Sequence, residues 1–251
     1  MTPSSPPSET RPRVTKVTQR AESGPERAKP HPGEAAAGTP RRARGRRPQG
    51  DGPDLRQQLL DAALACYVRH GIAATRLRDI AAEASVTPAL VHYYFSDAAG
   101  LRQAVIGERL MPVFQQVRDT LLGMPDAPLR DVVVAFVDVI CAQVRHHPWL
   151  PALWIREVVS EGGELRDLLV SRLAPQLAAV MAARFATEQA AGRLNPGLDP
   201  RLLMVSLVGL TLFPASGTPI WRQLFDAEDL GIDDIRGHAL ALLDRGLELP
   251  A

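Results

Sequence analysis

Three observations predict an all-α fold for this chain. Apolar residues recur every three or four positions, the spacing of a helix face, along most of the sequence after residue 52. Aromatic residues make up only 5%, and no stretch alternates β-branched and polar residues as a half-buried strand does. Glycine and proline close the apolar segments at lengths that suit helices. With 251 residues and 45% hydrophobic content, the chain can bury one or two cores.

Residues 1–52 are predicted to be a disordered basic arm. They are rich in Pro, Ser, Gly, Ala and Arg, and they hold 11 Lys and Arg residues against 5 Asp and Glu residues. Such a segment has too few large apolar side chains to offset the entropy lost on ordering. The arm ends in a compact basic run that includes Arg44, Arg46 and Arg47. This run is either a solvated tail or a DNA contact that follows phosphates or enters the minor groove.

The first helix is expected from Asp54 to His70. Asp54 is a suitable N-cap, and Gly71 is a suitable left-handed C-cap. Between them, residues at helical spacing form an apolar stripe that should be buried. The stripe consists of Leu55, Leu59, Ala63, Cys66 and Tyr67.

Two shorter helices follow within residues 75–101, separated by a tight turn at residues 85–88. Thr87 can cap the second of these helices, and Pro88 at its first position gives up only a backbone donor that has no partner there. The second helix is about two turns long and carries polar aromatic residues among its apolar ones. Two helices joined in this way predict a helix-turn-helix, whose second helix enters the DNA major groove.

The sequence from Leu55 to about Ala104 resembles the TetR family of bacterial transcriptional regulators. The resemblance rests on an Ala-Ala helix closed by glycine, a Thr-x-x-x-Asp-Ile-Ala segment, the turn, and a short helix that ends in aromatic residues. Two positions depart from the family pattern, because Ser85 replaces the turn glycine and Ala98 replaces a lysine. The matching residues are Ala62, Ala63, Tyr67, Gly71, Thr75, Asp79, Ile80, Ala81, Ala84, Val86, Tyr93 and Phe95.

The head carries several candidate DNA contacts. Leu90, Val91 and Phe95 of the second helix should face inward, which leaves its other face for DNA. Hydroxyl and guanidinium groups suit phosphate oxygens, and alanine or an aromatic ring can pack on a thymine methyl group. Each residue taken singly has a surface or packing role as its alternative. The candidates are Thr75, Arg76, Arg78, Thr87, Pro88, Ala89, His92, Tyr93 and Tyr94.

The head is formally neutral. Between Asp54 and Arg102, five arginines meet five acidic residues. DNA-binding proteins normally draw much of their affinity from neutralising phosphates. The basic arm is therefore the expected source of positive charge.

A linking helix should lead from Ala98 toward Gly123. We expect a kink or break near Met111, because Pro112 lacks a backbone donor. The body beyond it should contain five or six helices. The expected ranges are 128–147, 148–159, 164–191 with Pro175 inside, 202–213, and from Asp233 or Asp234 to about Gly246.

The last helix is amphipathic, and residues 202–213 are apolar around most of their circumference. Together they suggest a two-helix face that pairs with a second copy as a four-helix bundle; the alternative is that both simply complete the monomer core. The TetR resemblance implies the homodimer, which matches the two half-sites that a helix-turn-helix needs.

The resemblance also implies a small, often hydrophobic effector that binds in the body and releases DNA. Aromatic and methionine side chains could line its site, although at helical spacing such residues are more often core. The candidates are Phe136, Cys141, Trp149, Trp154, Arg156, Met181, Phe185, Met204 and Phe213, with His146 and Glu157 as further polar residues.

Other classes of protein fit the sequence poorly. It has no phosphate loop, nucleophile elbow or HExxH motif, so we expect no enzyme, no cofactor and no metal site. Cys66 and Cys141 lie in apolar helical contexts and are expected to be buried thiols in a reducing cytosol. No apolar run reaches the ~18 residues that span a bilayer, so we expect a soluble, cytoplasmic protein.

The predicted organisation is a basic arm (1–52), a helix-turn-helix DNA-binding domain (53–102), and a helical effector-binding and dimerisation domain (103–251). The expected function is a repressor that binds a palindromic operator as a homodimer and is released by an effector. The alternative is a non-specific DNA-coating or architectural protein that uses its basic arm.

Overall fold

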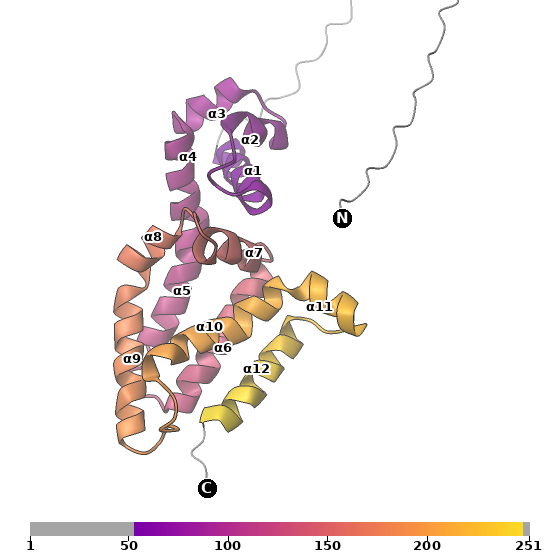
Figure 1. The fold of residues 1–251 in the computed structure, drawn as a ribbon. Coiled ribbons are helices and arrows are strands. Elements are labelled where there is room, and N and C mark those ends of the chain that lie inside the picture. Colours follow the sequence, from indigo (N-terminus) through magenta and orange to yellow (C-terminus); the bar gives the residue numbers. More distant parts are fainter. Residues whose placement is uncertain (1–52, 248–251) are drawn as a thin grey trace, which may run out of the picture. The chain divides into compact units, whose positions relative to one another are not determined.

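The computed structural model describes residues 53–247, and all of the regular secondary structure in this range is helical. The all-α prediction is confirmed. The first four helices form a head (Figure 1). They are α1 (Pro53–His70), α2 (Leu77–Glu83), α3 (Pro88–Phe95) and α4 (Ala98–Val105).

The head is built around the apolar stripe of α1. All five residues predicted for that stripe are buried, and Leu59 is fully so. Ile80 of α2, Val91 of α3 and Leu101 of α4 are also almost completely buried in this cluster. Full burial of a side chain of this size contributes about 1.5–3 kcal/mol. Asp54 lies in the first turn of α1 and is not its cap, because the helix begins at Pro53.

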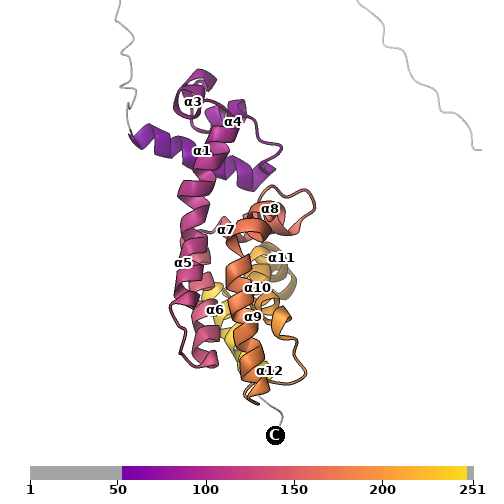
Figure 2. The ribbon, with the colours of Figure 1, turned by 90° about the vertical axis from the view of Figure 1, so that its left-hand side faces the viewer.

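A π-helical turn joins the head to the body. The chain runs from α4 through η1 (Ile106–Leu110) into α5 (Met111–Leu122), and Figure 2 shows α4 and α5 following one another as a single rod. The break predicted near Met111 takes the form of this wider turn, in which the Met111 N–H donates to the Ile106 carbonyl. Pro112 explains the turn, because its ring cannot donate and would clash with the carbonyl four residues earlier.

The body is organised around α6 (Leu129–His146), which packs against α5, α10 and α12. Eight of its residues are buried, and Val132 and Val137 are fully enclosed. The remaining elements are α7 (Leu150–Trp154), η2 (Ile155–Val159), α8 (Arg166–Leu168), η3 (Leu169–Leu173), α9 (Pro175–Ala190), α10 (Pro200–Ser216), α11 (Thr218–Phe225) and α12 (Ile232–Leu247).

Two predictions about the body helices were wrong. The single long helix expected over 164–191 is bent by 63° between residues 166–173 and 175–190, where Pro175 interrupts the backbone ladder. The last helix begins at Ile232, so Asp233 and Asp234 lie in its first turn, and the Asp234 carboxylate accepts from the Gly231 N–H at 2.7 Å.

Helix α11 was not predicted as a separate element. It follows α10 across a 70° bend. No single helix between residues 53 and 247 has the length and apolarity to cross a bilayer; the two bent pairs reach that threshold only when each pair is taken together.

Candidate functional site

Helix α3 follows α2 through a turn that Ser85 closes in a left-handed conformation, with φ of +56°. The Val86 N–H donates to the Ala81 carbonyl at 2.9 Å and ends α2. Thr87 occupies the N-cap position as predicted, but its side chain makes no capping hydrogen bond. Its exposed hydroxyl is therefore available to a partner outside the chain.

One side of α3 is anchored in the head and the other is open to solvent. Val91 and Phe95 are buried, and Leu90 is half-buried. The candidates Thr87, Pro88, Ala89, His92 and Tyr93 are all exposed, whereas Tyr94 is half-buried. This division follows the 3.6-residue period of the helix.

Tyr93 is the most prominent side chain of that open face. It is 80% exposed, and its ring meets the Tyr94 ring edge-on at a centroid distance of 5.3 Å. The neighbouring His92 is tied back to the helix end, because its Nδ1 lies 2.8 Å from the Ser96 carbonyl oxygen. Tyr93 can therefore reach a partner that lies along the helix.

The end of α3 is fixed by a close approach of the backbone. Ser96 has φ of +62°, and the Asp97 carboxylate caps α4 by accepting from the Gly100 N–H at 2.7 Å. A Cβ atom on Gly100 would lie 2.3 Å from the Phe95 carbonyl oxygen. The angle between α3 and α4 therefore requires glycine at this position.

Three of the five head arginines pair with carboxylates that lie outside their own helix. Arg56 pairs with Glu108 at 2.6 Å, Arg69 pairs with Glu83, and Arg102 pairs with Glu164 at 2.9 Å. These hydrogen-bonded arginines lower the pKa of Glu83 and Glu108 below the ordinary value. The paired arginines serve to join helices to one another.

The remaining two, Arg76 and Arg78, are exposed at the start of α2. Arg78 lies 3.6 Å from the adjacent Asp79, and Arg76 forms no ion pair within residues 53–247. Thr75 is less available than expected, because its hydroxyl already donates to the Gly71 carbonyl at 2.6 Å. The Asp79 carboxylate also accepts a hydrogen bond from the Arg76 backbone N–H at 3.0 Å. The arm residues Arg44, Arg46 and Arg47 lie outside the described range.

The candidate effector residues do not come together around one cavity. Phe136, Cys141, Met181 and Phe185 are buried in the body core, and burial raises the pKa of the Cys141 thiol to about 11. Met204 packs at the edge of the same core. The other members of the set are distributed between a cavity and the surface.

Arg156 is exposed, and Phe213 is 69% exposed on α10. Neither lines the cavity that lies where the body meets the head. Trp149 and Trp154 do line a cavity where the body meets the head, and both indoles contact the head core and the body core. Of the candidate effector residues, only these two tryptophans line this cavity.

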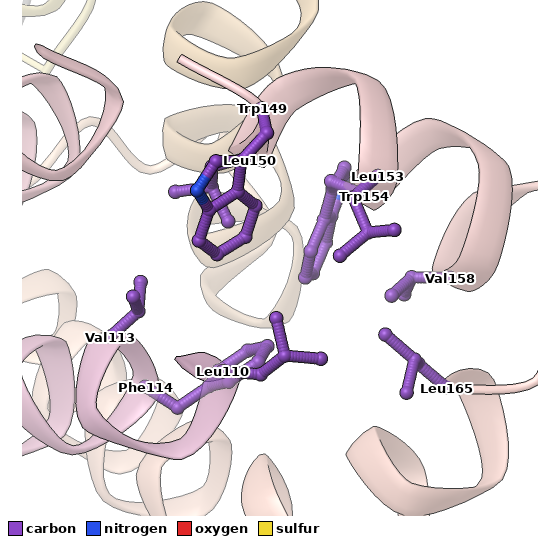
Figure 3. Close-up of a pocket in the computed structure, with 9 residues that line it drawn as sticks. All are labelled: Leu110, Val113, Phe114, Trp149, Leu150, Leu153, Trp154, Val158 and Leu165. Carbon is purple, nitrogen blue, oxygen red and sulfur yellow. The ribbon is translucent and has the colours of Figure 1, made fainter. Parts of the chain in front are cut away.

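The junction cavity lies between η1 with α5 on one side and α7 with η2 on the other. Figure 3 shows Trp149 and Trp154 facing Leu110 and Phe114 across it. Its volume is about 10 Å³, which is room for about one water molecule. The lining consists of Leu110, Val113, Phe114, Trp149, Leu150, Leu153, Trp154, Val158 and Leu165.

A buried carboxylate beside this cavity connects the body to the head. Glu157 of η2 is only 3% exposed. Its Oε1 accepts from the Ile72 N–H, just after α1, at 2.9 Å, and its Oε2 accepts from the Glu164 N–H at 3.1 Å. The positive φ of Gly71, +87°, lets the chain turn against this carboxylate. The sequence analysis named Glu157 as a polar candidate for the effector site and did not predict its contact with the head.

Exposed apolar side chains concentrate on the last three helices. Among residues 53–247, seven of the twelve exposed large hydrophobic residues lie on α10, α11 and α12. Surfaces of this kind mark interaction sites more often than isolated apolar residues do. We call these seven the C-terminal apolar surface: Leu202, Val205, Phe213, Ile220, Leu224, Phe225 and Leu242.

An exposed second helix, joined by a tight turn to a first helix that is anchored through buried Ile80 and Ala81, defines a helix-turn-helix protein of the DNA-binding class. Residues 59–105 match the family described as "Bacterial regulatory proteins, tetR family". The resemblance to the TetR family is thereby confirmed, and the head of this protein is a TetR-type helix-turn-helix domain.

The curated relatives match between 33% and 71% of this chain. The chain is 34% identical over 91 residues to the nicotine-responsive transcriptional repressor HdnoR of Paenarthrobacter nicotinovorans, covering 36% of this chain and 46% of that protein. It is 25% identical over 179 residues to the transcriptional repressor SCO4008 of Streptomyces coelicolor, covering 71% and 88%. The chain thus spans about half the length of the first relative.

Solved structures share the fold beyond the head. The ketosteroid transcriptional regulator KstR2 of Mycobacterium tuberculosis matches with a TM-score of 0.62 at 18% identity, covering 79% of this chain and 97% of that one. The repressor NalD of Pseudomonas aeruginosa matches with a TM-score of 0.55 at 23% identity, covering 78% and 97%. At these identities the likeness concerns the fold alone.

Proposed function

We propose that this protein is a transcriptional repressor that binds a palindromic DNA operator as a homodimer. The exposed face of α3 carries the proposal, above all Tyr93, which stands 80% exposed on a helix whose other side is anchored by buried Val91 and Phe95. A rigid helix with an open aromatic and polar face is what the major groove admits. Two of the curated relatives are transcriptional repressors, which supports this direction of regulation.

The proposed dimer forms through the C-terminal apolar surface. Phe213 on α10 and Leu242 on α12 are exposed, although the same helices bury Leu207 and Leu243 in the monomer. A two-fold pairing of these helices would cover the exposed side chains and place two α3 helices for neighbouring major grooves, about 34–36 Å apart.

The dimer is tested by Phe213→Arg, which places a charge in the proposed interface. Val170→Arg is the matched control, because Val170 is similarly exposed but lies on η3. In sedimentation measurements the first variant should be a monomer and the second should remain a dimer. Equal dimerisation of both variants would remove this surface from the proposal.

Phosphate contacts in the proposal come from the two exposed arginines and from the basic arm. Arg76 and Arg78 supply little charge alone, because the other head arginines are held in ion pairs. Deleting residues 1–47 should therefore weaken DNA binding and flatten its dependence on salt. Unchanged binding at two salt concentrations would contradict a role for the arm.

The function is tested by selecting bound sequences from random double-stranded DNA. A regulator should enrich a palindrome, and it should bind that palindrome far more tightly than a scrambled sequence. Tyr93→Ala should abolish this binding while helicity and dimerisation stay unchanged, with Val170→Ala as a control for truncation of an exposed side chain elsewhere. A ratio near one between specific and scrambled DNA would instead support a DNA-coating protein.

Release by a small molecule is the remaining part of the proposal. An effector that binds one conformation of the dimer better than the other shifts the population toward a head spacing that does not fit the operator. Such a protein works in the cytoplasm, where its DNA lies.

A further inference from the structure

Three π-helical turns interrupt the helices of residues 53–247, and each is closed by a hydrogen bond to the carbonyl five residues earlier. In η2 the Ser160 N–H donates to Ile155 at 2.8 Å, and in η3 the Ala174 N–H donates to Leu169 at 2.9 Å. Turns of this kind are rare and often occur at functional sites. Proline explains the turns at η1 and η3, because Pro112 and Pro175 follow them, but it does not explain η2.

All three turns border one apolar region. The junction cavity is lined by Leu110 of η1 and Val158 of η2. A second cavity of about the same size lies next to it and is lined by Ile106 and Leu110 of η1 and by Leu173 of η3. We call the two cavities and the walls between them the junction seam.

The two cavities share three walls. Leu110, Phe114 and Leu165 line both, so a displacement of these side chains would unite the two spaces. Phe114 is only half-buried, which leaves it room to move. Each cavity has room for only about one water molecule, and a ligand must therefore enter by separating η1 from η2 and η3.

The lining sets the chemistry of that ligand. The side chains around both cavities are apolar except for the indole N–H groups of Trp149 and Trp154, whose rings add two aromatic faces. The lining holds no charged side chain, so a charged ligand would lose its hydration there without a partner of opposite charge. A flat uncharged molecule would instead stack against the indoles and bury its apolar surface.

From these contacts we infer that the junction seam is the effector site and that it takes an uncharged, largely apolar molecule with at least one flat ring. The inference rests on the proposed function and gives the effector a chemical class and a place. Ligand binding in the seam would change the position of the head through two connections. One is the rod that contains η1, and the other is Glu157, which adjoins Val158 and holds the Ile72 N–H.

The inference is tested with N-phenylnaphthylamine, an uncharged fluorescent probe, and with its sulfonated analogue anilinonaphthalenesulfonate. The uncharged probe should saturate at one molecule per chain and quench the emission of Trp149 and Trp154. The sulfonated analogue should bind at least about tenfold more weakly, because the seam offers its charge no partner. Similar affinities for the two probes would overturn the assignment of ligand class.

Two substitutions of Phe114, which lines both cavities, test where the probe binds. Phe114→Trp fills the seam and should weaken binding of the uncharged probe at least about tenfold, whereas Phe114→Ala unites the cavities and should strengthen it. Val170→Ala should change neither, and thermal melting verifies that each variant is folded. If both Phe114 variants bind the uncharged probe with the affinity of the unchanged protein, the proposed location is wrong.

These readouts involve no DNA. If the seam binds the probe but DNA selection yields no palindrome, the proposed function fails and the ligand site stands. If a palindrome is selected but no probe binds, the inference about the seam fails alone.

Discussion

Replacing Glu157 tests whether a single buried carboxylate holds the head on the body. The side chain is 3% exposed and accepts two backbone N–H groups, from Ile72 at 2.9 Å and from Glu164 at 3.1 Å. A hydrogen bond to a charged group contributes about 1.5–3 kcal/mol, and a buried donor left without a partner costs about 1–3 kcal/mol. The two donors differ in one respect, because Ile72 is buried and Glu164 is exposed.

The expected loss comes mostly from Ile72. In Glu157→Ala the exposed Glu164 N–H can turn to water, whereas the Ile72 N–H cannot, so unfolding should become easier by about 2–4 kcal/mol. Glu157→Gln keeps one oxygen for Ile72 but presents an NH₂ group to the other donor. That variant should lose only about 1 kcal/mol, since removing a buried charge also recovers part of its desolvation cost.

Denaturant unfolding measures these losses, and hydrogen exchange of the Ile72 amide locates them. In Glu157→Ala that amide should exchange at least about tenfold faster, because each 1.4 kcal/mol is a factor of ten in the opening equilibrium. Glu164→Gln is the matched control, because it removes only an exposed ion pair with Arg102, worth about 0–1 kcal/mol, and keeps its backbone donor. Unchanged protection of Ile72 in Glu157→Ala would refute the reasoning.

Three further results are expected from the head and the body. Gly100→Ala should lower the free energy of unfolding by about 1–3 kcal/mol, because the new Cβ would lie 2.3 Å from a backbone carbonyl oxygen. In the control Gly107→Ala the new Cβ meets open space, so the free energy of unfolding should stay the same or rise slightly. Equal free energies of unfolding for the two variants would contradict this. Ser85→Gly should stabilise the head by up to about 1 kcal/mol, because a φ of +56° strains a residue with a side chain by about 1–2 kcal/mol. The greater entropy of glycine in the unfolded chain offsets part of this gain. A lower melting temperature of the variant would count against the prediction. The thiols of Cys66 and Cys141 should resist a maleimide at pH 8 in the native protein and react after unfolding. Burial raises the pKa of both thiols, that of Cys141 to about 11, and so keeps the reactive thiolate scarce at pH 8. Rapid labelling of the folded protein would disprove this.

The head could be predicted almost residue by residue because its signals are local. Gly71 and Pro88 mark helix ends through the conformations that their own backbones allow. The buried stripe of α1 and the inward face of α3 follow from the helical period. The sequence marked Ser85 only as a departure from the family's turn glycine, and the structure shows that this serine takes a positive φ of +56°.

The sequence could not determine what each candidate effector residue packs against, for a physical reason. An aromatic or methionine residue at helical spacing shows that it will be buried by something, but not whether the partner is core, cavity or a second chain. Phe185 and Phe213 look alike in sequence, yet one is fully buried in the body and the other is 69% exposed. Only the arrangement of helices around each position separates them.

The sequence by itself determined the helical class, the helix-turn-helix with its open aromatic face, and the break in the linking helix next to Pro112. These properties depend on neighbours within one or two helical turns. The tertiary structure decided that Glu157 meets Ile72 across 85 positions of sequence, that Trp149 and Trp154 face Leu110 and Phe114, and that the apolar residues of the last helices remain exposed. Such contacts join segments far apart in the chain, and their formation depends on how whole helices pack against one another.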